Sequence, residues 1–317
     1  MKILPLVLVS VTCFLGTPLQ ARVWTSADGT HETEAEFISV SNGSVTLQKP
    51  GGTRITFSLD KLSADDHAWV KDKLASEPSP GTTGSNVRTG AEKSNEYTKQ
   101  ITGKWERLED AELKYRFFAG RKLKGSKLYP LVIYLHGRGG DVMTPDVPGQ
   151  AGDFAKDANY NKRPCFIIAP QCPTGEFWSG NNSANVIKVI EMLVKNLPVD
   201  EKRIYITGYS MGGYGTFDIV AKEPKLFAAA VPVAGGGNPS TADSMKRVPF
   251  WIIHGDADTV VNVEQSRKMV EALKKARGKV DYTEIPGGSH GIIGQVYQDE
   301  KLHEWMFEQV QGKKAAK

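Results

Sequence analysis

From about Lys104 onward, short runs of apolar residues alternate with stretches in which apolar residues recur every three or four positions. The apolar runs are continuous, which indicates strands buried on both faces and hence a mostly parallel sheet. The intervening stretches predict helices that cover this sheet. The expected strands are 131–135, 166–169, 203–207, 228–233, 250–253 and 280–285, and the expected helices are 184–196, 211–222, 263–276 and 300–310. Residues 104–313 are therefore predicted to form a doubly wound α/β domain.

The composition excludes several classes of protein. Hydrophobic residues make up 40% and charged residues 24% of the 317 residues, which is typical of a globular chain and not of a disordered one. The 40 Lys and Arg residues exceed the 36 Asp and Glu residues by a net charge of +4. No run of five or more basic residues occurs, so the sequence gives no indication of a nucleic-acid partner.

The first 21 residues have the pattern of a secretory signal peptide. The charged start at Lys2 precedes an almost wholly apolar stretch, 3–15, and small or helix-breaking residues follow up to Ala21. This stretch is shorter than the roughly 20 residues of a transmembrane helix, and a buried helix is the alternative. Because no second long apolar segment follows, we expect a product that is exported to the periplasm or the medium and has no membrane span.

Two cysteines, Cys165 and Cys172, flank the expected strand 166–169. A strand rises about 3.3 Å per residue, so their Cα atoms should lie well beyond the roughly 7 Å limit for a disulfide. We therefore expect two free, buried thiols. The sequence contains no Cys-x-x-Cys and no His-Glu-x-x-His, so we expect no metal and no cofactor.

Residues 22–76 are predicted to form a small β-rich module. Alternating apolar residues at 45–47 and 55–59 indicate strands, and turn residues at 41–43 and 50–52 indicate hairpins. Ser63, followed three residues later by Asp66, predicts the start of a short amphipathic helix. Residues 77–103 are polar and rich in Ser, Thr, Gly and Pro, which predicts a flexible linker.

The residues of this module resemble a known family. The resemblance lies in Arg22-Val23-Trp24-Thr25, in Glu34-Ala35-Glu36-Phe37, and in Leu59-Asp60-Lys61-Leu62-Ser63 with Asp66. Together they resemble the first homology domain of the yeast Sla endocytic adaptor. That resemblance implies an SH3-like barrel. It leaves open whether residues 22–76 bind a peptide or protein ligand or serve only as a packing module.

A glycine-rich turn marks the candidate nucleophile. It reads Gly208-Tyr209-Ser210-Met211-Gly212 and lies between an expected strand and an expected helix, which is the context that the G-x-S-x-G motif requires. A turn this tight requires small neighbours, and Gly208 and Gly212 supply them. Ser210 is therefore predicted to present its hydroxyl above the sheet as a nucleophile.

A serine nucleophile needs a base and an acid that orients the base. His290 lies in the small-residue loop 287–291 before the last helix and is the candidate base. Two carboxylates, Asp256 and Asp258, follow the strand 250–253. Asp258 is favoured as the acid, because its H-G-x-x-D spacing resembles that of the acid in α/β-hydrolases. Asp256 is expected to cap or orient the loop, and the reverse assignment is the alternative.

The loop His136-Gly137-Arg138-Gly139-Gly140 follows the expected strand 131–135. Its glycines allow backbone N–H groups to face a developing oxyanion. We expect the N–H of Met211, directly after the nucleophile, to be one donor. The N–H of Arg138 should be the other, with Gly139 as the alternative. His136 is predicted to be structural.

Together, these motifs resemble the α/β-hydrolase superfamily over residues 104–313. Within it they are most similar to feruloyl and acetylxylan esterases, polyhydroxybutyrate depolymerases and the dienelactone-hydrolase-like predicted peptidases. Gln171-Cys172-Pro173, which precedes Phe177-Trp178, also resembles that group, in which an aromatic residue at this place borders the substrate cleft. The resemblance therefore makes Trp178 a substrate-binding candidate, with a buried core position as the alternative.

The connection 235–248 is too short for a large lid, and the longest loop near the site is 141–163. An open cleft favours an ester on a bulky, polymeric or carbohydrate molecule. The sequence therefore predicts an exported serine carboxylester hydrolase. A peptidase of the prolyl-oligopeptidase type is one alternative, against which no acidic pocket for a peptide N-terminus is evident. The other is a binding protein in which residues 22–76 carry the function.

Overall fold

The computed structural model describes residues 22–41, 44–50, 53–76, 101–124 and 127–312, in two compact units that divide after Ser85. The predicted signal peptide, the linker up to residue 100 and the centres of the two predicted hairpin turns lie outside the described residues. Among the described residues, no helix is long and apolar enough to cross a membrane.

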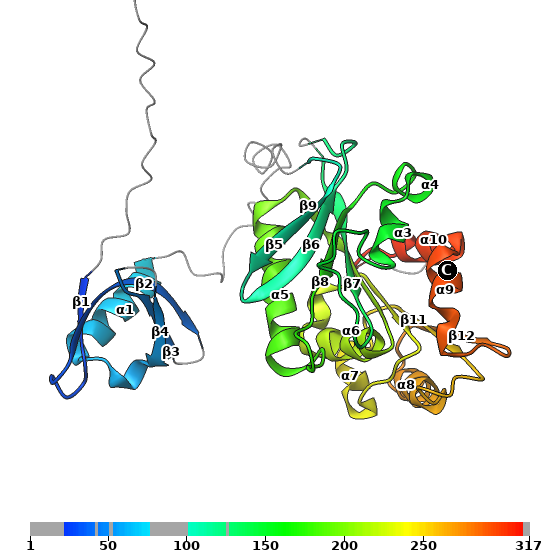
Figure 1. The fold of residues 1–317 in the computed structure, drawn as a ribbon. Helices are drawn as coiled ribbons and strands as arrows, with labels where there is room; N and C mark the ends of the chain where they lie inside the picture. The colour runs from blue at the N-terminus through cyan, green and yellow to red at the C-terminus, as the bar shows by residue number, and fades with distance from the viewer. Residues whose placement is uncertain (1–21, 42–43, 51–52, 77–100, 125–126, 313–317) are drawn as a thin grey trace, which may run out of the picture. The chain divides into compact units, whose positions relative to one another are not determined.

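The N-terminal unit is a four-stranded antiparallel meander with one helix (Figure 1). Its strands, in sheet order, are β1 (Arg22–Thr25), β2 (Glu32–Ser41), β3 (Ser44–Gln48) and β4 (Arg54–Ser58). The 3-10 helix η1 (Leu59–Lys61) and the helix α1 (Ala64–Ser76) follow. Between them the chain returns to the end of β1, where the Ser63 N–H donates to Thr25 O at 2.9 Å. The predicted small β module is therefore present.

A buried carboxylate joins α1 to β1 in this unit. Asp66 is 3% exposed and accepts hydrogen bonds from Arg22 Nη2 at 2.5 Å, the Thr25 N–H at 2.7 Å and Ser63 Oγ at 2.9 Å. The Asp66 N–H in turn donates to Ser63 Oγ at 3.2 Å, which confirms Ser63 as the residue that precedes and caps the helix. The carboxylate thus holds the helix, the strand and the cap together.

We expect Asp66→Ala to destabilise this unit by about 3 kcal/mol, because it removes the charged partner of Arg22 and leaves the Thr25 N–H without an acceptor. Faster hydrogen exchange in residues 22–76 of the full chain would show it. Asp65→Ala is the matched control, because Asp65 is exposed in the same first turn of α1. Equal exchange in the two variants would contradict the assigned role of Asp66.

The C-terminal unit is built on an eight-stranded sheet in the order β12-β11-β10-β9-β7-β8-β6-β5. The strands from β12 to β8 in that order pair in parallel, and the hairpin β5–β6 adds an antiparallel edge. The strands are β5 (Trp105–Asp110), β6 (Leu113–Ala119), β7 (Tyr129–Leu135), β8 (Phe166–Pro170), β9 (Val199–Tyr209), β10 (Ala229–Val233), β11 (Phe250–Gly255) and β12 (Val280–Ile285).

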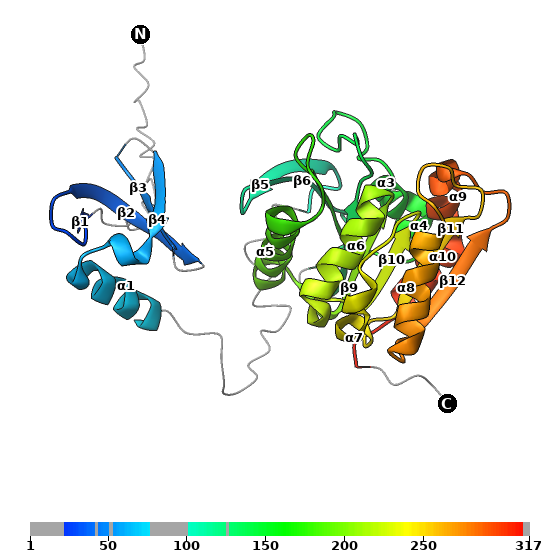
Figure 2. The same cartoon turned by 90° about the horizontal axis from the view of Figure 1, so that it is seen from below.

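Helices cover both faces of this sheet (Figure 2). The helices α5 (Gly180–Asn196), α6 (Met211–Lys222) and α8 (Glu264–Lys275) lie on one face. The helices α3 (Ala151–Ala155), α4 (Asp157–Tyr160), α9 (Ile293–Gln298) and α10 (Glu300–Glu308) lie on the other, and α7 (Ala242–Met245) packs near α8. The predicted α/β class is confirmed, as are the six expected strands and four expected helices.

The core explains why the parallel strands were predictable and the edge hairpin was not. Every residue of β7, β8 and β10 is buried, whereas β5 alternates between half-buried and exposed positions. In β6, Arg116 is 4% exposed, and its Nη1 donates to the carbonyls of Val142, Thr144 and Asp146. A buried arginine interrupts the apolar pattern of the strand, and its contacts hold the loop that starts at residue 141.

The predicted free thiols are confirmed. Cys165 and Cys172 are both buried and unpaired, and β8 separates them. Burial raises the pKa of the Cys172 thiol to about 11, so it stays protonated near neutral pH. The expected long loop 141–163 contains two short helices, α3 and α4.

Candidate active site

The turn between β9 and α6 holds Ser210 in a conformation that side chains rarely adopt, with φ 56° and ψ −116°. Close backbone approaches on both sides impose it. A Cβ atom at Gly208 would lie 2.3 Å from Gly212 O, and one at Gly212 would lie 2.0 Å from Leu135 O. Only glycine fits at these two positions, which is the physical requirement that the sequence motif expresses.

Three loops at the carboxyl ends of the parallel strands β9, β11 and β12 bring Ser210, His290 and Asp258 together. His290 begins the 3-10 helix η5 (His290–Ile292) after β12, and Asp258 follows β11. His290 Nε2 lies 2.9 Å from Ser210 Oγ, and His290 Nδ1 lies 2.6 Å from Asp258 Oδ2. Parallel strands end at the same edge of a sheet, so residues up to 80 positions apart meet there.

The two candidate acids occupy different places. The Asp258 side chain is fully buried, and its Oδ1 accepts the N–H groups of Val260 at 2.8 Å and Val261 at 2.9 Å. Burial acts to raise the pKa of Asp258, but the hydrogen bonds from His290 and these two N–H groups outweigh it and hold the pKa below its ordinary value. Asp256 instead accepts the Gly287 N–H at 2.6 Å, which links the acid loop to the histidine loop.

Tyr209, to which the sequence motif assigns no role, supports the histidine. Its hydroxyl donates to His290 O at 2.5 Å, and the two rings lie 5.0 Å apart. The residue occupies a variable position of the G-x-S-x-G motif, so no sequence signal could have identified this contact.

The expected oxyanion loop forms a turn in which the Gly140 N–H donates to Gly137 O at 3.1 Å. Gly139 has φ 73°, and Arg138 precedes it at the tip of the turn. Within the described part of the chain, the N–H groups of Arg138 and Met211 have no acceptor. Met211 is the first residue of α6, so its N–H is also one of the unpaired donors at a helix N-terminus.

His136 packs beneath this turn and uses both ring nitrogens to hold it. Its Nδ1 lies 2.7 Å from Gly137 O, and its Nε2 accepts the Cys172 N–H at 3.0 Å, so the proton belongs on Nδ1. Burial lowers the pKa of His136, which keeps the ring neutral. Gln171 adds a second tie, because its Nε2 donates to Gly140 O at 3.1 Å.

An apolar pocket of about 740 Å³ opens beside Ser210. Its exposed aromatic and aliphatic residues are Phe177 (54% exposed), Tyr214 (38%) and Val260 (69%). Trp178 also lines the pocket but is only 2% exposed, and its Nε1 donates to His136 O at 3.0 Å. Trp178 is thus a core residue that forms part of the pocket wall, whereas its neighbour in the chain, Phe177, is exposed.

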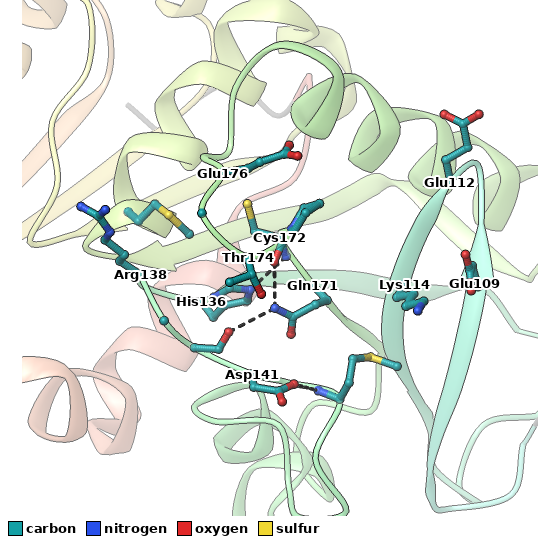
Figure 3. A pocket seen from close by; sticks show the side chains of 16 residues that line it. Glu109, Glu112, Lys114, His136, Arg138, Asp141, Gln171, Cys172, Thr174 and Glu176 are labelled. Carbon is teal, nitrogen blue, oxygen red and sulfur yellow. Dashed lines mark hydrogen bonds between the residues drawn. The ribbon is translucent and has the colours of Figure 1, made fainter.

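A second pocket of about 550 Å³ borders the loop 136–140 and includes Arg138, which also lines the first pocket (Figure 3). The hairpin β5–β6 forms one wall with Glu109, Glu112 and Lys114, and loops after β7 and β8 form the other. The charged residues of that second wall are Arg138, Asp141 and Glu176. Four of the residues that line this pocket therefore carry carboxylates, although no acidic pocket for a peptide N-terminus is evident in the sequence.

The two pockets meet at the candidate oxyanion donors. Arg138 and Met211 line both, and the Arg138 guanidinium lies 5.7 Å from the centre of the Phe177 ring. A carbonyl held by the N–H groups of Arg138 and Met211 would therefore have an apolar space on one side and a polar space on the other.

Among the described residues, no three His, Cys, Asp or Glu side chains form a group that could hold a metal ion.

Two family models match the chain. The model of the prolyl oligopeptidase family matches residues 176–250 and 237–313, and that of the SLA1 homology domain 1 matches residues 16–77. Among solved structures, a thermostable esterase is 35% identical, with a TM-score of 0.60, over 65% of this chain and 63% of its own. The C-terminal unit therefore has the α/β-hydrolase fold, and both predicted resemblances are confirmed.

Curated relatives match shorter stretches. A bifunctional acetylxylan esterase/xylanase of Neocallimastix patriciarum is 26% identical over 140 residues, 43% of this chain and 20% of that protein. An esterase of Mycobacterium tuberculosis is 36% identical over 74 residues, 23% of this chain and 17% of that protein. The chain thus spans about a fifth of the length of these two relatives.

We expect Asp258→Asn to slow the labelling of Ser210 by a fluorophosphonate on the order of 10⁴-fold, because an amide can no longer fix the tautomer and charge of His290. Asp256→Asn should leave the labelling rate almost unchanged, because Asp256 contacts the Gly287 backbone and not the imidazole. Labelling rates measured at equal concentrations of folded protein decide between them. The reverse order of effects would show that Asp256 is the acid.

Proposed function

We propose that this chain is an exported serine carboxylester hydrolase. The observation that carries the proposal is the hydrogen-bonded series Ser210–His290–Asp258, at 2.9 and 2.6 Å, beside two unpaired backbone N–H groups. Ser210 Oγ attacks the ester carbonyl while His290 Nε2 takes its proton. His290 then returns the proton to the departing alcohol, and water attacks the acyl-enzyme by the same route.

The remaining groups lower the energy of the charged states. The N–H groups of Arg138 and Met211 bind the oxyanion of the tetrahedral intermediate, and the positive end of α6 adds to their effect. Asp258 stays ionised, orients the imidazole and stabilises the imidazolium that forms when Ser210 loses its proton. Removing one oxyanion donor typically costs about 10²- to 10³-fold in kcat.

The two pockets support an ester with unlike halves. The apolar pocket beside Phe177, Tyr214 and Val260 takes the acyl group. The pocket lined by carboxylates and by Lys114 takes the alcohol, because hydroxyl groups donate to carboxylates and accept from ammonium groups. This pairing fits esters of carbohydrate or of other bulky, polymeric molecules, and an acetylxylan esterase is among the relatives.

An open site fits such substrates. Between β10 and β11 the chain forms only the 3-10 helix η4 (Pro239–Thr241) and the short helix α7, so no large lid covers Ser210 from this connection. The export of the chain through residues 1–21 belongs to the same proposal. We also propose that residues 22–76 form an SH3-like barrel and that this barrel binds a peptide or protein ligand.

A serine peptidase is the second candidate, favoured by the match to the prolyl oligopeptidase family model. The same triad cleaves amides when the leaving amine is held beside the histidine. The carboxylates Glu109, Glu112, Asp141 and Glu176 give the polar pocket an excess of negative charge over Lys114 and Arg138, which would suit a peptide amine. Peptide anilides and p-nitrophenyl esters, compared on the same preparation, separate the two candidates.

We expect Ser210→Ala to abolish ester hydrolysis, with a loss on the order of 10⁴- to 10⁶-fold in kcat, and to leave the fold intact. The strained turn survives because Gly208 and Gly212 provide its close approaches. An acyl-chain series beside feruloyl and acetyl-xylan substrates measures the activity, with the exposed Ser240→Ala as control. Near-normal turnover of Ser210→Ala would refute the mechanism.

Deletion of residues 22–103 should leave hydrolysis of small soluble esters largely unchanged, because every residue of the proposed site lies after Lys104. The truncated chain is compared with the full chain on p-nitrophenyl acetate after circular dichroism has shown both to be folded. A folded but inactive truncated chain would show that the N-terminal unit contributes to the site.

A further inference from the structure

We propose that His254 is a positioning residue for Asp258, so that the carboxylate of the site is held by two histidines and not by one. This inference rests on the proposed function, because it concerns how the triad acid is oriented. His254 lies in β11, four residues before Asp258, and its side chain is fully buried. Its Nε2 lies 3.2 Å from Asp258 Oδ2, the same oxygen that contacts His290.

The position of the proton on His254 follows from its neighbours. The Nε2 atom also lies 2.9 Å from Val261 O, and a backbone carbonyl can only accept. The proton must therefore be on Nε2, where it is shared between Val261 O and Asp258 Oδ2. Burial lowers the pKa of His254 and so favours the neutral ring, with Nδ1 left as an acceptor.

A buried serine completes the arrangement from α8. Ser266 is 0% exposed, and its Oγ lies 2.7 Å from His254 Nδ1. The same Oγ lies 2.9 Å from Gly235 O, so its single proton stands between two acceptors, Gly235 O and Nδ1. Ser266 therefore ties the ring to α8 and to the residues after β10, while Val261 O is the group that fixes the proton on Nε2. A series of polar contacts then runs from Ser210 through His290, Asp258 and His254 to Ser266.

With this contact the Asp258 carboxylate uses its full capacity. Its Oδ1 accepts the N–H groups of Val260 at 2.8 Å and Val261 at 2.9 Å, and its Oδ2 faces His290 Nδ1 at 2.6 Å and His254 Nε2 at 3.2 Å. A carboxylate has about four acceptor positions. Donors on both oxygens prevent the group from rotating, so Oδ2 stays directed at His290.

Three further charged groups lie near His254 besides Asp258. Asp258 favours the charged form of the His254 ring, and His290 opposes it. On the neighbouring strand β12, Glu284 is paired with Arg267 of α8 at 2.6 Å, which reduces the effect of that carboxylate on the ring. Asp258 is thus the charged group that His254 directly contacts.

Two amide variants separate a positioning role from a packing role. In His254→Gln the side-chain NH₂ can reach the place of Nε2 and still donate to Asp258. In His254→Asn the amide reaches only the place of Nδ1, so Asp258 and Val261 O lose their donor. The matched control is His303→Asn, because His303 is 1% exposed and its Nε2 also contacts a backbone carbonyl, Tyr297 O at 2.9 Å.

We expect His254→Asn to lower kcat by about 10- to 100-fold, the cost of a lost hydrogen bond to a charged group, with KM within about twofold of the wild type. The acid limb of kcat/KM should move to higher pH, because a carboxylate with one donor fewer attracts the imidazolium proton more strongly. His254→Gln should recover most of kcat and return the acid limb toward its wild-type position. His303→Asn should lose stability but keep kcat per active site titrated with a fluorophosphonate.

Two results would overturn the inference while leaving the proposed function intact. One is an active wild type with unchanged kcat and acid limb in His254→Asn. The other is an equal loss in His254→Gln and His254→Asn with no movement of the acid limb, which would indicate packing alone. A wild-type chain without esterase activity would instead refute the proposed function. In that case the rate of fluorophosphonate labelling of Ser210, measured against pH in the same variants, still tests His254.

Discussion

The site depends on a backbone contact that excludes every side chain. A Cβ atom at Gly212 would lie 2.0 Å from Leu135 O, so the first turn of α6 can pass directly over the end of β7. That approach brings the Met211 N–H close to the loop after β7, which contains Arg138. It also fixes Ser210 at φ 56°, where its hydroxyl reaches His290. One steric constraint thus places the nucleophile and both candidate oxyanion donors.

The candidate acid, Asp258, is held in place by hydrogen-bond donors. Where the nucleophile turn relies on missing side chains, Asp258 relies on a full set of donors from Val260, Val261, His290 and His254. A buried carboxylate without partners would take up a proton and lose its charge. Surrounded in this way it remains ionised, and its direction is fixed by groups from β11 and the loop that follows.

Much of the fold and site could be predicted from the sequence, because each predictable feature has a local pattern. The continuous apolar runs of β7, β8 and β10 reflect burial on both faces, and the glycines around Ser210 reflect steric need. The hairpin β5–β6 was missed because β5 is a half-exposed edge strand and Arg116 interrupts β6. Tyr209 acts on His290, a residue from a distant segment, about which a single sequence carries no pattern. His254 is the histidine of the H-G-x-x-D pattern, but the pattern does not say that its ring faces the carboxylate of Asp258.

The candidate triad and one wall of the polar pocket stand on different parts of the sheet. The proposed triad stands on the parallel strands β9, β11 and β12, whose pairing is fixed by the buried core. The polar pocket takes one wall from the antiparallel hairpin β5–β6 at the far edge of the sheet. Its charged residues Glu109, Glu112 and Lys114 contribute nothing to the hydrogen bonds that orient Ser210, His290 or Asp258. Changes in this wall can therefore alter the proposed alcohol site without disturbing the proposed catalytic groups.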